Sequence, residues 1–399
     1  MSVTAAKGFR ASGVRAGLKA SGRPDLALVV NDGPLDVAAG VFTSNRVVAA
    51  PVTWSRRAVA DGRARAVILN SGSANACTGE RGAADAAATA QQVAYLLSTA
   101  GPGQEVGARE VLVCSTGVIG QPLDMDRLLE GAGSAARALA ATPAAGHDAA
   151  TAIMTTDTVS KEDAVTRTTE GVTWSVGGMI KGVGMLAPGL ATMLCVMTTD
   201  AVVQAGQAQR ALSQAAARTV NRISSDGCMS TNDTVLLLAS GASGALPSQE
   251  ELDDAVAEVL GRLGRRLVAD AEGATHDIAI TVTGAVSEAA AEAAARTVSS
   301  SNLLRCAVAG ADPNWGRVLS QLGTVPEDVC PFDPDEVDVT INGVTIFRHG
   351  RLGEDRSLVD MTPRETRIDI ALNAGTAQAT VWTNDLTHGY VTINADYTT

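Results

Sequence analysis

The chain has 399 residues, of which 46% are apolar and 3% aromatic, and its formal net charge at pH 7 is −12. This length suffices for one large domain or two medium ones, and the apolar, alanine- and glycine-rich composition excludes a disordered or fibrous protein. The acidic balance and the lack of a dense basic cluster in the sequence exclude sequence-independent binding of nucleic acid.

Neither the cysteines nor the histidines have the spacing of a metal site. The six cysteines stand far apart without a C-x-x-C pair and the four histidines are scattered, so no zinc or iron–sulfur site is expected. Most of the cysteines stand in apolar runs, which favours buried reduced thiols over disulfides. The basic N-terminus lacks the apolar stretch of a secretory signal, and the apolar stretch 185–205 is broken by Pro188 and Asp200. We therefore predict a cytoplasmic protein without a membrane span.

Strand and helix patterns alternate along the first part of the chain. A β-rich run precedes an alanine-rich helix, and a second strand ends in a turn at Thr116-Gly117 before two further helices. The expected strands are 65–70 and 110–115, and the expected helices are 81–100, 124–141 and the region around 148–153.

The second part of the chain has more strand character. Apolar strand-like residues run from 171 to 200 around a proline turn, and the tail alternates with period two beside Asn342-Gly343, which is typical of a hairpin. The expected helices are 205–222, 249–270 and 288–298, and the expected strands are 233–239, 277–282, 337–341, 344–347, 367–372, 376–383 and 390–393. The pattern indicates an α/β protein with mixed β-sheets and helices on their outer faces.

The stretch 179–200 (MIKGVGMLAPGLATMLCVMTTD) has a loop that places Ala191-Thr192 at the start of an apolar strand. If the Thr192 hydroxyl attacks the Ala191 carbonyl, an N-to-O acyl shift gives an ester, and water then cuts the chain. The new α-amine, with an unperturbed pKa of about 7.7–8.0, is a general base beside the threonine hydroxyl. On these residues alone, an uncut strand is the simpler interpretation.

The segment KGVGMLAPGLATML resembles the processing site of the ornithine acetyltransferases, the bifunctional glutamate N-acetyltransferases of arginine biosynthesis. Gly189, Leu190 and Ser73 depart from that family's pattern, and they affect loop shape more than chemistry. Further blocks agree in the same order along nearly the whole chain. They are 39–52 (AGVFTSNRVVAAPV), 70–79 (NSGSANACTG), 114–120 (CSTGVIG), 153–157 (IMTTD), 226–234 (DGCMSTNDT), 310–317 (GADPNWGR) and 393–397 (INADY).

The resemblance implies roles for particular residues. Thr192 is expected to be both the cleavage site and the nucleophile, and the Thr116 hydroxyl with the Gly117 N–H is expected to form the oxyanion hole. Lys181 suits an α-carboxylate and Glu272 the ornithine ammonium, although a solvated helix end is the simpler interpretation of Glu272. The implied substrate contacts are Thr155, Lys181, Thr192, Glu272, Asn394 and Thr399.

The implied reaction passes the acetyl group of N2-acetyl-L-ornithine to Thr192 and then to L-glutamate, without a metal or a bound cofactor. Some members of the family also use acetyl-CoA as a donor, and the sequence does not separate the two kinds. Cleavage would give fragments 1–191 and 192–399 that share one core. A layered sandwich of the self-processing, N-terminal-nucleophile type is expected, assembled as an α2β2 heterotetramer or larger.

Two other interpretations stay open at this point. The first is a self-processing aminopeptidase or amidase on the same fold, in which water replaces glutamate as the acceptor. The second is an uncut, non-catalytic relative that binds amino acids. Asp312 and Arg317 are expected to have a structural role, as an ion pair around a turn.

Overall fold

The computed structural model describes residues 2–99, 105–185 and 193–396. The chain divides into two compact units. Among the described residues, the first consists of those up to Asn221 with Cys228–Leu267, and the second of Arg222–Gly227 with those from Val268 to Asp396. Ala191, Thr192 and Thr399, to which the sequence assigns cleavage, nucleophile and substrate roles, lie outside the described residues.

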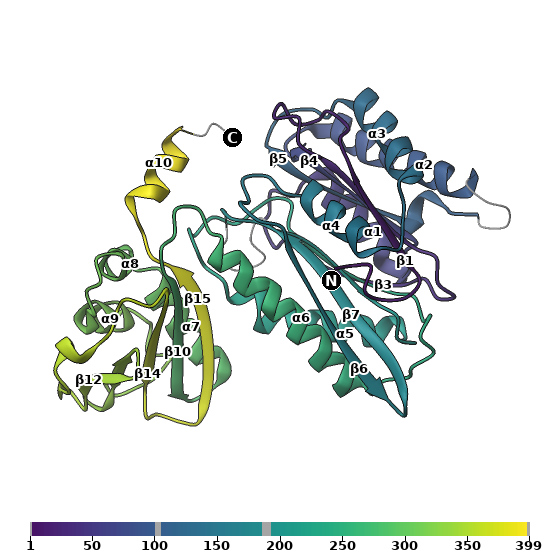
Figure 1. The fold of residues 1–399 in the computed structure, drawn as a ribbon. Coiled ribbons are helices and arrows are strands. Elements are labelled where there is room, and N and C mark those ends of the chain that lie inside the picture. The colour runs from purple at the N-terminus through teal and green to yellow at the C-terminus, as the bar shows by residue number, and fades with distance from the viewer. Residues whose placement is uncertain (1, 100–104, 186–192, 397–399) are drawn as a thin grey trace. The chain divides into compact units, whose positions relative to one another are not determined.

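A four-stranded sheet of the first unit is buried on both faces (Figure 1). In its second strand, Leu26 and Leu28 face a core shared with two helices, whereas Ala27 and Val29 face a second core, because successive strand residues point to opposite faces. The order is β1 (Phe9–Val14), β2 (Leu26–Asn31), β4 (Ala66–Ser73) and β5 (Val111–Val118), and the helices are α2 (Gly79–Thr99) and α3 (Met125–Arg137).

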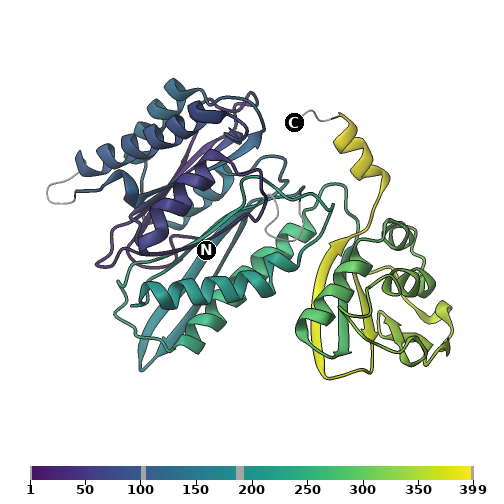
Figure 2. The same ribbon diagram turned by 180° about the vertical axis from the view of Figure 1, so that it is seen from behind.

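A five-stranded sheet packs against the other face of the first sheet. Its residues Met179, Val196 and Leu236 share a core with Val29, and this core also includes residues of α1 (Ala50–Ala58) and α4 (Pro143–Ala152). The helices α5 (Ala205–Arg218) and α6 (Gln249–Ala269) run beside this sheet (Figure 2). The strand order is β3 (Val37–Phe42), β9 (Thr234–Ala239), β8 (Leu194–Thr199), β7 (Val172–Lys181) and β6 (Lys161–Thr169).

The second unit is built on a six-stranded mixed sheet with its own core, to which the alanine-rich face of α7 (Glu288–Ser299) contributes. Trp315 stacks on Phe347 with ring centroids 4.8 Å apart. The strands in order are β13 (Arg351–Leu352), β12 (Val344–Arg348), β11 (Asp338–Ile341), β14 (Glu365–Ala371), β10 (Asp277–Ala285) and β15 (Ala377–Asn384); α8 (Asn302–Ala309), α9 (Trp315–Leu322) and α10 (His388–Asp396) complete the unit.

These layers confirm the predicted α/β class, with mixed sheets and helices on outer faces. Two local predictions are wrong. Thr116-Gly117 is not a turn beyond the strand, because β5 continues to Val118, and 390–393 lies within the helix α10 instead of a strand. Within the part of the chain that the structure describes, no helix has the length and apolarity needed to cross a membrane.

The cysteine and ion-pair predictions hold only in part. All six cysteines lie in the described ranges and none is in a disulfide bond, but Cys77, Cys228 and Cys306 are exposed and only the other three are buried. Asp312 forms its ion pair with Arg356 at 2.6 Å, whereas the Arg317 guanidinium donates to a backbone carbonyl. The expected Asp312–Arg317 pair is therefore wrong.

Candidate active site

Thr116 and Gly117 lie near the end of β5, where it runs parallel to β4. Gly117 pairs with Gly72, and a bulge follows directly in β4. Gly117 has a φ of 133°, and a Cβ atom on it would lie 2.4 Å from the Gly72 carbonyl carbon, so only glycine fits there. Thr116 is buried beside this glycine pair, at 3% exposure.

Lys181 brings the second sheet to Thr116. It is the last residue of β7, it is 2% exposed, and its Nζ donates to Thr116 Oγ1 at 3.2 Å. Because the lysine donates to this oxygen, the hydrogen of the Thr116 hydroxyl can be donated elsewhere. The structure thus brings Lys181 to the neighbouring residues Thr116 and Gly117, although Lys181 and Thr116 are 65 positions apart in the chain.

Asp157 organises the backbone next to Lys181. Its Oδ1 accepts from Lys161 Nζ and from the Gly182 N–H, both at 2.7 Å, and its Oδ2 accepts from the Thr155 N–H at 2.9 Å. Burial by itself would raise the pKa of Asp157, but the ammonium groups of Lys181 and Lys161 and these hydrogen bonds outweigh it and lower that pKa to about 2. Asp157 is therefore an anion that fixes Thr155 relative to Lys181.

Asp233 is a buried carboxyl group that the sequence analysis missed. It directly precedes β9, and its Oδ1 accepts from the Met193 N–H at 3.0 Å. Its Oδ2 is buried and has no hydrogen-bond partner among the residues that the structure describes. Burial raises the pKa of Asp233 well above its usual range, although the Met193 amide and nearby hydroxyls act in the opposite direction. The only signal in the sequence is its place in the block 226–234, directly before an apolar run.

Glu272 and Asn394 belong to the second unit, where they lie side by side. Asn394 Nδ2 donates to Glu272 Oε2 at 3.1 Å, and the Asn394 side chain is exposed. The Thr387 hydroxyl donates to the Gly273 carbonyl at 2.6 Å and ties the start of α10 to the same loop. Two residues that are 122 positions apart in the chain therefore form one polar pair.

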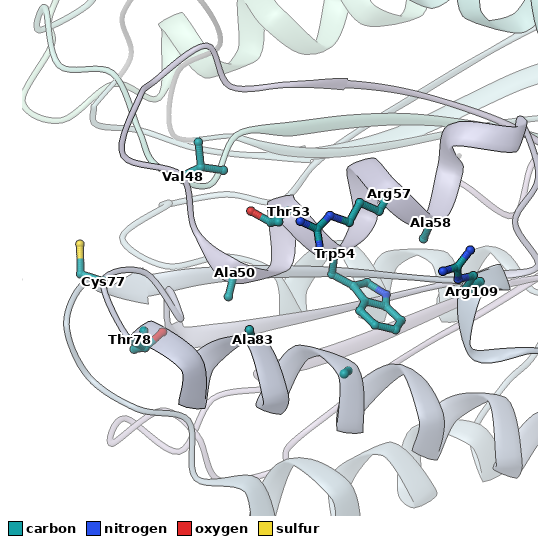
Figure 3. Close-up of a pocket in the computed structure, with 12 residues that line it drawn as sticks. Val48, Ala50, Thr53, Trp54, Arg57, Ala58, Cys77, Thr78, Ala83 and Arg109 are labelled. Carbon is teal, nitrogen blue, oxygen red and sulfur yellow. The ribbon is translucent and has the colours of Figure 1, made fainter.

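A cavity of about 500 Å³ opens in the first unit beside α1 and the start of α2. Figure 3 shows Trp54, Arg57, Cys77 and Arg109 among the side chains that line it. None of the described residues to which the sequence assigned a role lines this cavity. Within the described ranges, no group of three or more His, Cys, Asp or Glu residues is placed to hold a metal ion.

The first unit of this α/β protein thus has two stacked sheets, with a buried lysine–threonine pair beside a glycine between them. The sequence profile of the ArgJ family matches residues 10–399. Relatives named arginine biosynthesis bifunctional protein ArgJ, from Bifidobacterium longum and Streptomyces coelicolor, are 61% and 55% identical over 399 and 397 residues, and each alignment covers 100% of both chains. The chain belongs to the ArgJ family, and the assignment made from the sequence motifs is confirmed.

Two solved structures also match. An ornithine acetyltransferase from Mycobacterium tuberculosis, complexed with ornithine, is 52% identical, with coverage of 48% of this chain and 96% of that chain and a TM-score of 0.44. The arginine biosynthesis bifunctional protein from Bacillus halodurans is 38% identical, with coverage of 49% and 95% and a TM-score of 0.43.

Proposed function

We propose that this chain transfers the acetyl group of N2-acetyl-L-ornithine to L-glutamate through an acetyl ester on Thr192. The relatives' names support the pathway, and the ornithine complex of the M. tuberculosis protein supports the substrate class. The observation that carries the proposal is the hydrogen bond from Lys181 to the buried Thr116, next to the Gly117 backbone. We place the reaction in the cytoplasm, with no bound cofactor, and acetyl-CoA is an additional donor to be tested.

Thr192 becomes a nucleophile when the chain cuts itself after Ala191. The strands on the two sides of this position support the proposal that the fragments 1–191 and 192–399 stay together. Lys181 of β7 pairs with Leu194 of β8 in an antiparallel ladder that continues to Thr199. The cut therefore leaves the two fragments joined by the hydrogen bonds of one sheet, and we propose that such pairs assemble as α2β2 or larger units.

In the first half-reaction, the Thr192 hydroxyl attacks the acetyl carbonyl while the α-amine takes its proton. The Thr116 hydroxyl and the Gly117 N–H stabilise the oxyanion that forms, and Lys181 supports this by donating to the Thr116 oxygen. The oxyanion collapses as the α-amine passes the proton to the ornithine nitrogen, and ornithine leaves. Loss of one such donor typically costs roughly 10²–10³ in rate. In the second half-reaction, the amine of glutamate attacks the ester, and the threonine is restored.

The remaining residues hold the substrate and the strand that carries the nucleophile. Asp233 binds the Met193 amide, and we assign it the positioning of the start of β8. We assign neutral contacts with the substrate to Thr155, Asn394 and the terminal Thr399. Glu272 is assigned to the ornithine ammonium, together with Asn394 to which it is hydrogen-bonded.

The competing function is hydrolysis by a self-processing aminopeptidase or amidase, in which water accepts the acyl group. The test supplies N-acetylornithine with and without glutamate and measures the ornithine released. We expect sustained release only with glutamate, together with stoichiometric N-acetylglutamate. Equal release in both reactions would establish the hydrolase and reject the transferase.

A further inference from the structure

Lys19 is a cation that the proposed reaction has not used. Its Nζ donates to the carbonyl oxygens of Pro24 at 2.8 Å and Ala152 at 3.4 Å, and its side chain is partly accessible to solvent. Both acceptors are neutral, so these contacts orient the ammonium group without neutralising its charge. A lysine held in this way is ready to bind an anion.

The carboxylates that act on Lys19 are already engaged by other donors. Asp25 accepts from the backbone N–H groups of Ala16 and Leu18, both at 2.6 Å, and of Lys19 itself at 2.9 Å. Asp157 accepts from Lys161 and from two backbone amides. Neither carboxylate forms a hydrogen bond with Lys19 Nζ, so the ammonium group keeps a donor for an incoming anion.

The backbone places Lys19 beside the candidate oxyanion hole, within the same unit. A Cβ atom on Gly72 would lie 2.9 Å from the Leu18 carbonyl oxygen and 3.5 Å from Lys19 Cγ, while Gly117 crowds the Gly72 carbonyl from its own strand. The Ala152 carbonyl that binds Lys19 also accepts from the Ser71 hydroxyl at 2.6 Å. Lys19 is thus anchored to the same end of β4 that carries the glycine pair.

Charges around this end of the sheet are unbalanced. Lys19, Lys161 and Lys181 are three cations, and Asp25 and Asp157 are two anions, with Arg23 as a further cation that acts on Lys19. Asp233 is a third carboxyl group near Lys181, and burial raises its pKa above the usual range; even with Asp233 counted as an anion, the four cations outnumber the three anions. A substrate with a carboxylate group would supply the missing negative charge.

We propose that the Lys19 ammonium group binds a carboxylate of the amino-acid substrates, as a second cation beside Lys181, and so determines specificity. This inference rests on the proposed function, because N-acetylornithine and glutamate both carry an α-carboxylate and glutamate carries a second one. Lys181 is almost fully buried and donates to Thr116, whereas Lys19 is the more accessible cation. A carboxylate that enters from solvent therefore meets Lys19.

If Lys19 binds the substrate carboxylate, substrate binding should depend on pH. Burial lowers the pKa of Lys19 to about 8; Asp25 and Asp157 oppose this effect, while Lys181 and Arg23 add to it. In the free enzyme, the Lys19 charge is present below that pH and is lost above it. Substrate binding should therefore weaken as the pH rises from 7 to 9, and an arginine at this position should remove that part of the effect.

The test compares self-cleaved wild-type enzyme with Lys19→Gln, Lys19→Arg and the control Lys7→Gln, in which an exposed lysine is replaced. We expect Lys19→Gln to raise KM by about 10- to 100-fold, the effect of losing a charged hydrogen bond, with little change in kcat. A rise for both substrates identifies the α-carboxylate, and a rise for glutamate alone identifies its side-chain carboxylate. The Lys7→Gln control should leave both KM values unchanged.

Unchanged KM values in Lys19→Gln, or a fall in kcat alone, would overturn the inference and leave the transferase proposal intact. A wild-type enzyme that releases ornithine equally without glutamate would instead remove the proposed function. If Lys19→Gln does not fold, the pH series on wild type and Lys19→Arg decides. The inference requires the wild-type KM to rise above pH 8 more than that of Lys19→Arg, and equal profiles would contradict it.

Discussion

Thr116 links the two sheets of the first unit through its hydrogen bond with Lys181, and its role can be tested at the scale of one residue. Thr116→Ala removes the hydroxyl donor but keeps the Gly117 N–H. We expect the transfer rate to fall by roughly 10²–10³, as for other oxyanion-hole donors, and the loss of the buried hydrogen bond with Lys181 to cost about 1–3 kcal/mol of stability. Thr116→Ser restores a hydroxyl group and should recover much of the rate, measured as ornithine release in single-turnover reactions. A fully active Thr116→Ala enzyme would refute this role.

The raised pKa of Asp233 makes the stability of the folded chain depend on pH. Its pKa is raised in the folded chain above the ordinary value of 3.8, so the folded state keeps a proton that the unfolded state releases. The free energy of unfolding should therefore decrease as the pH rises from about 4 toward the folded-state pKa. The Met193 N–H can still donate to the amide oxygen in Asp233→Asn, while the titration is lost.

The Asp233 prediction is best measured in the Thr192→Ala background, where the proposed self-cleavage cannot occur. Denaturation by urea at pH 5, 6 and 7 gives the free energy of unfolding with and without Asp233→Asn. The free energy of unfolding of the chain that keeps Asp233 should decrease from pH 5 to pH 7 relative to that of the chain with Asp233→Asn. Parallel pH profiles would contradict a raised pKa at this position.

The sequence predicted some site residues and not others, for a physical reason. Thr116, Gly117 and Lys181 stand in motifs whose chemistry is visible from their residue types. Asp233 and Lys161 owe their importance to burial, which depends on strands that are distant in the chain. The Lys181–Thr116 contact joins two sheets, and no spacing along the sequence predicts it.

At the scale of elements, the close approach of the parallel strands β4 and β5 at Gly72 and Gly117 depends on glycine. Gly117→Ala would force a Cβ atom against the Gly72 backbone at a positive φ, and we expect it to destabilise the fold by about 1–3 kcal/mol or more. Gly120→Ala is the matched control, because Gly120 also has a positive φ but nothing lies within 4 Å of its Cβ position. Gly120→Ala should lower the free energy of unfolding by about 1 kcal/mol. Equal losses of stability for the two variants in urea denaturation would show that β4 and β5 are not tightly packed at Gly117.

The helix α10 is the element that the sequence analysis got wrong. Its segment Tyr390–Ile393 contains β-branched residues and was expected to be a strand, but no residue of α10 is buried. The helix carries Asn394 to Glu272 instead of contributing to the core. Alternating apolar residues at the end of a chain do not show whether a sheet edge is available to them.

Removal of residues 394–399 should therefore affect substrate binding more than folding. We expect a change in stability within about 0.5 kcal/mol, as for other surface changes, and a clear rise in KM. Thr392→Ala, an exposed change on the same helix, is the control that should leave KM unaltered. If the truncated enzyme retains its KM, the roles assigned to Asn394 and Thr399 are incorrect.

At the scale of the whole molecule, two divisions of the chain must be distinguished. The compact units separate near Val268, whereas the proposed cut falls between Ala191 and Thr192. The first unit therefore contains strands from both proposed fragments, and β7 and β8 pair across the cut. The α/β class followed from the alternating patterns, but the division into units did not, because no composition change marks it.

The central claim is that Thr192 becomes a nucleophile only after the chain is cut, and intact-mass spectrometry tests it most directly. Purified enzyme should give two fragments that end at Ala191 and begin at Thr192. Brief exposure to N-acetylornithine without glutamate should add one acetyl group to the C-terminal fragment, and glutamate should remove it. Thr192→Ala should remain one chain of 40.6 kDa without transfer activity. A wild-type protein that stays uncut while it transfers acetyl groups at full rate would contradict the account.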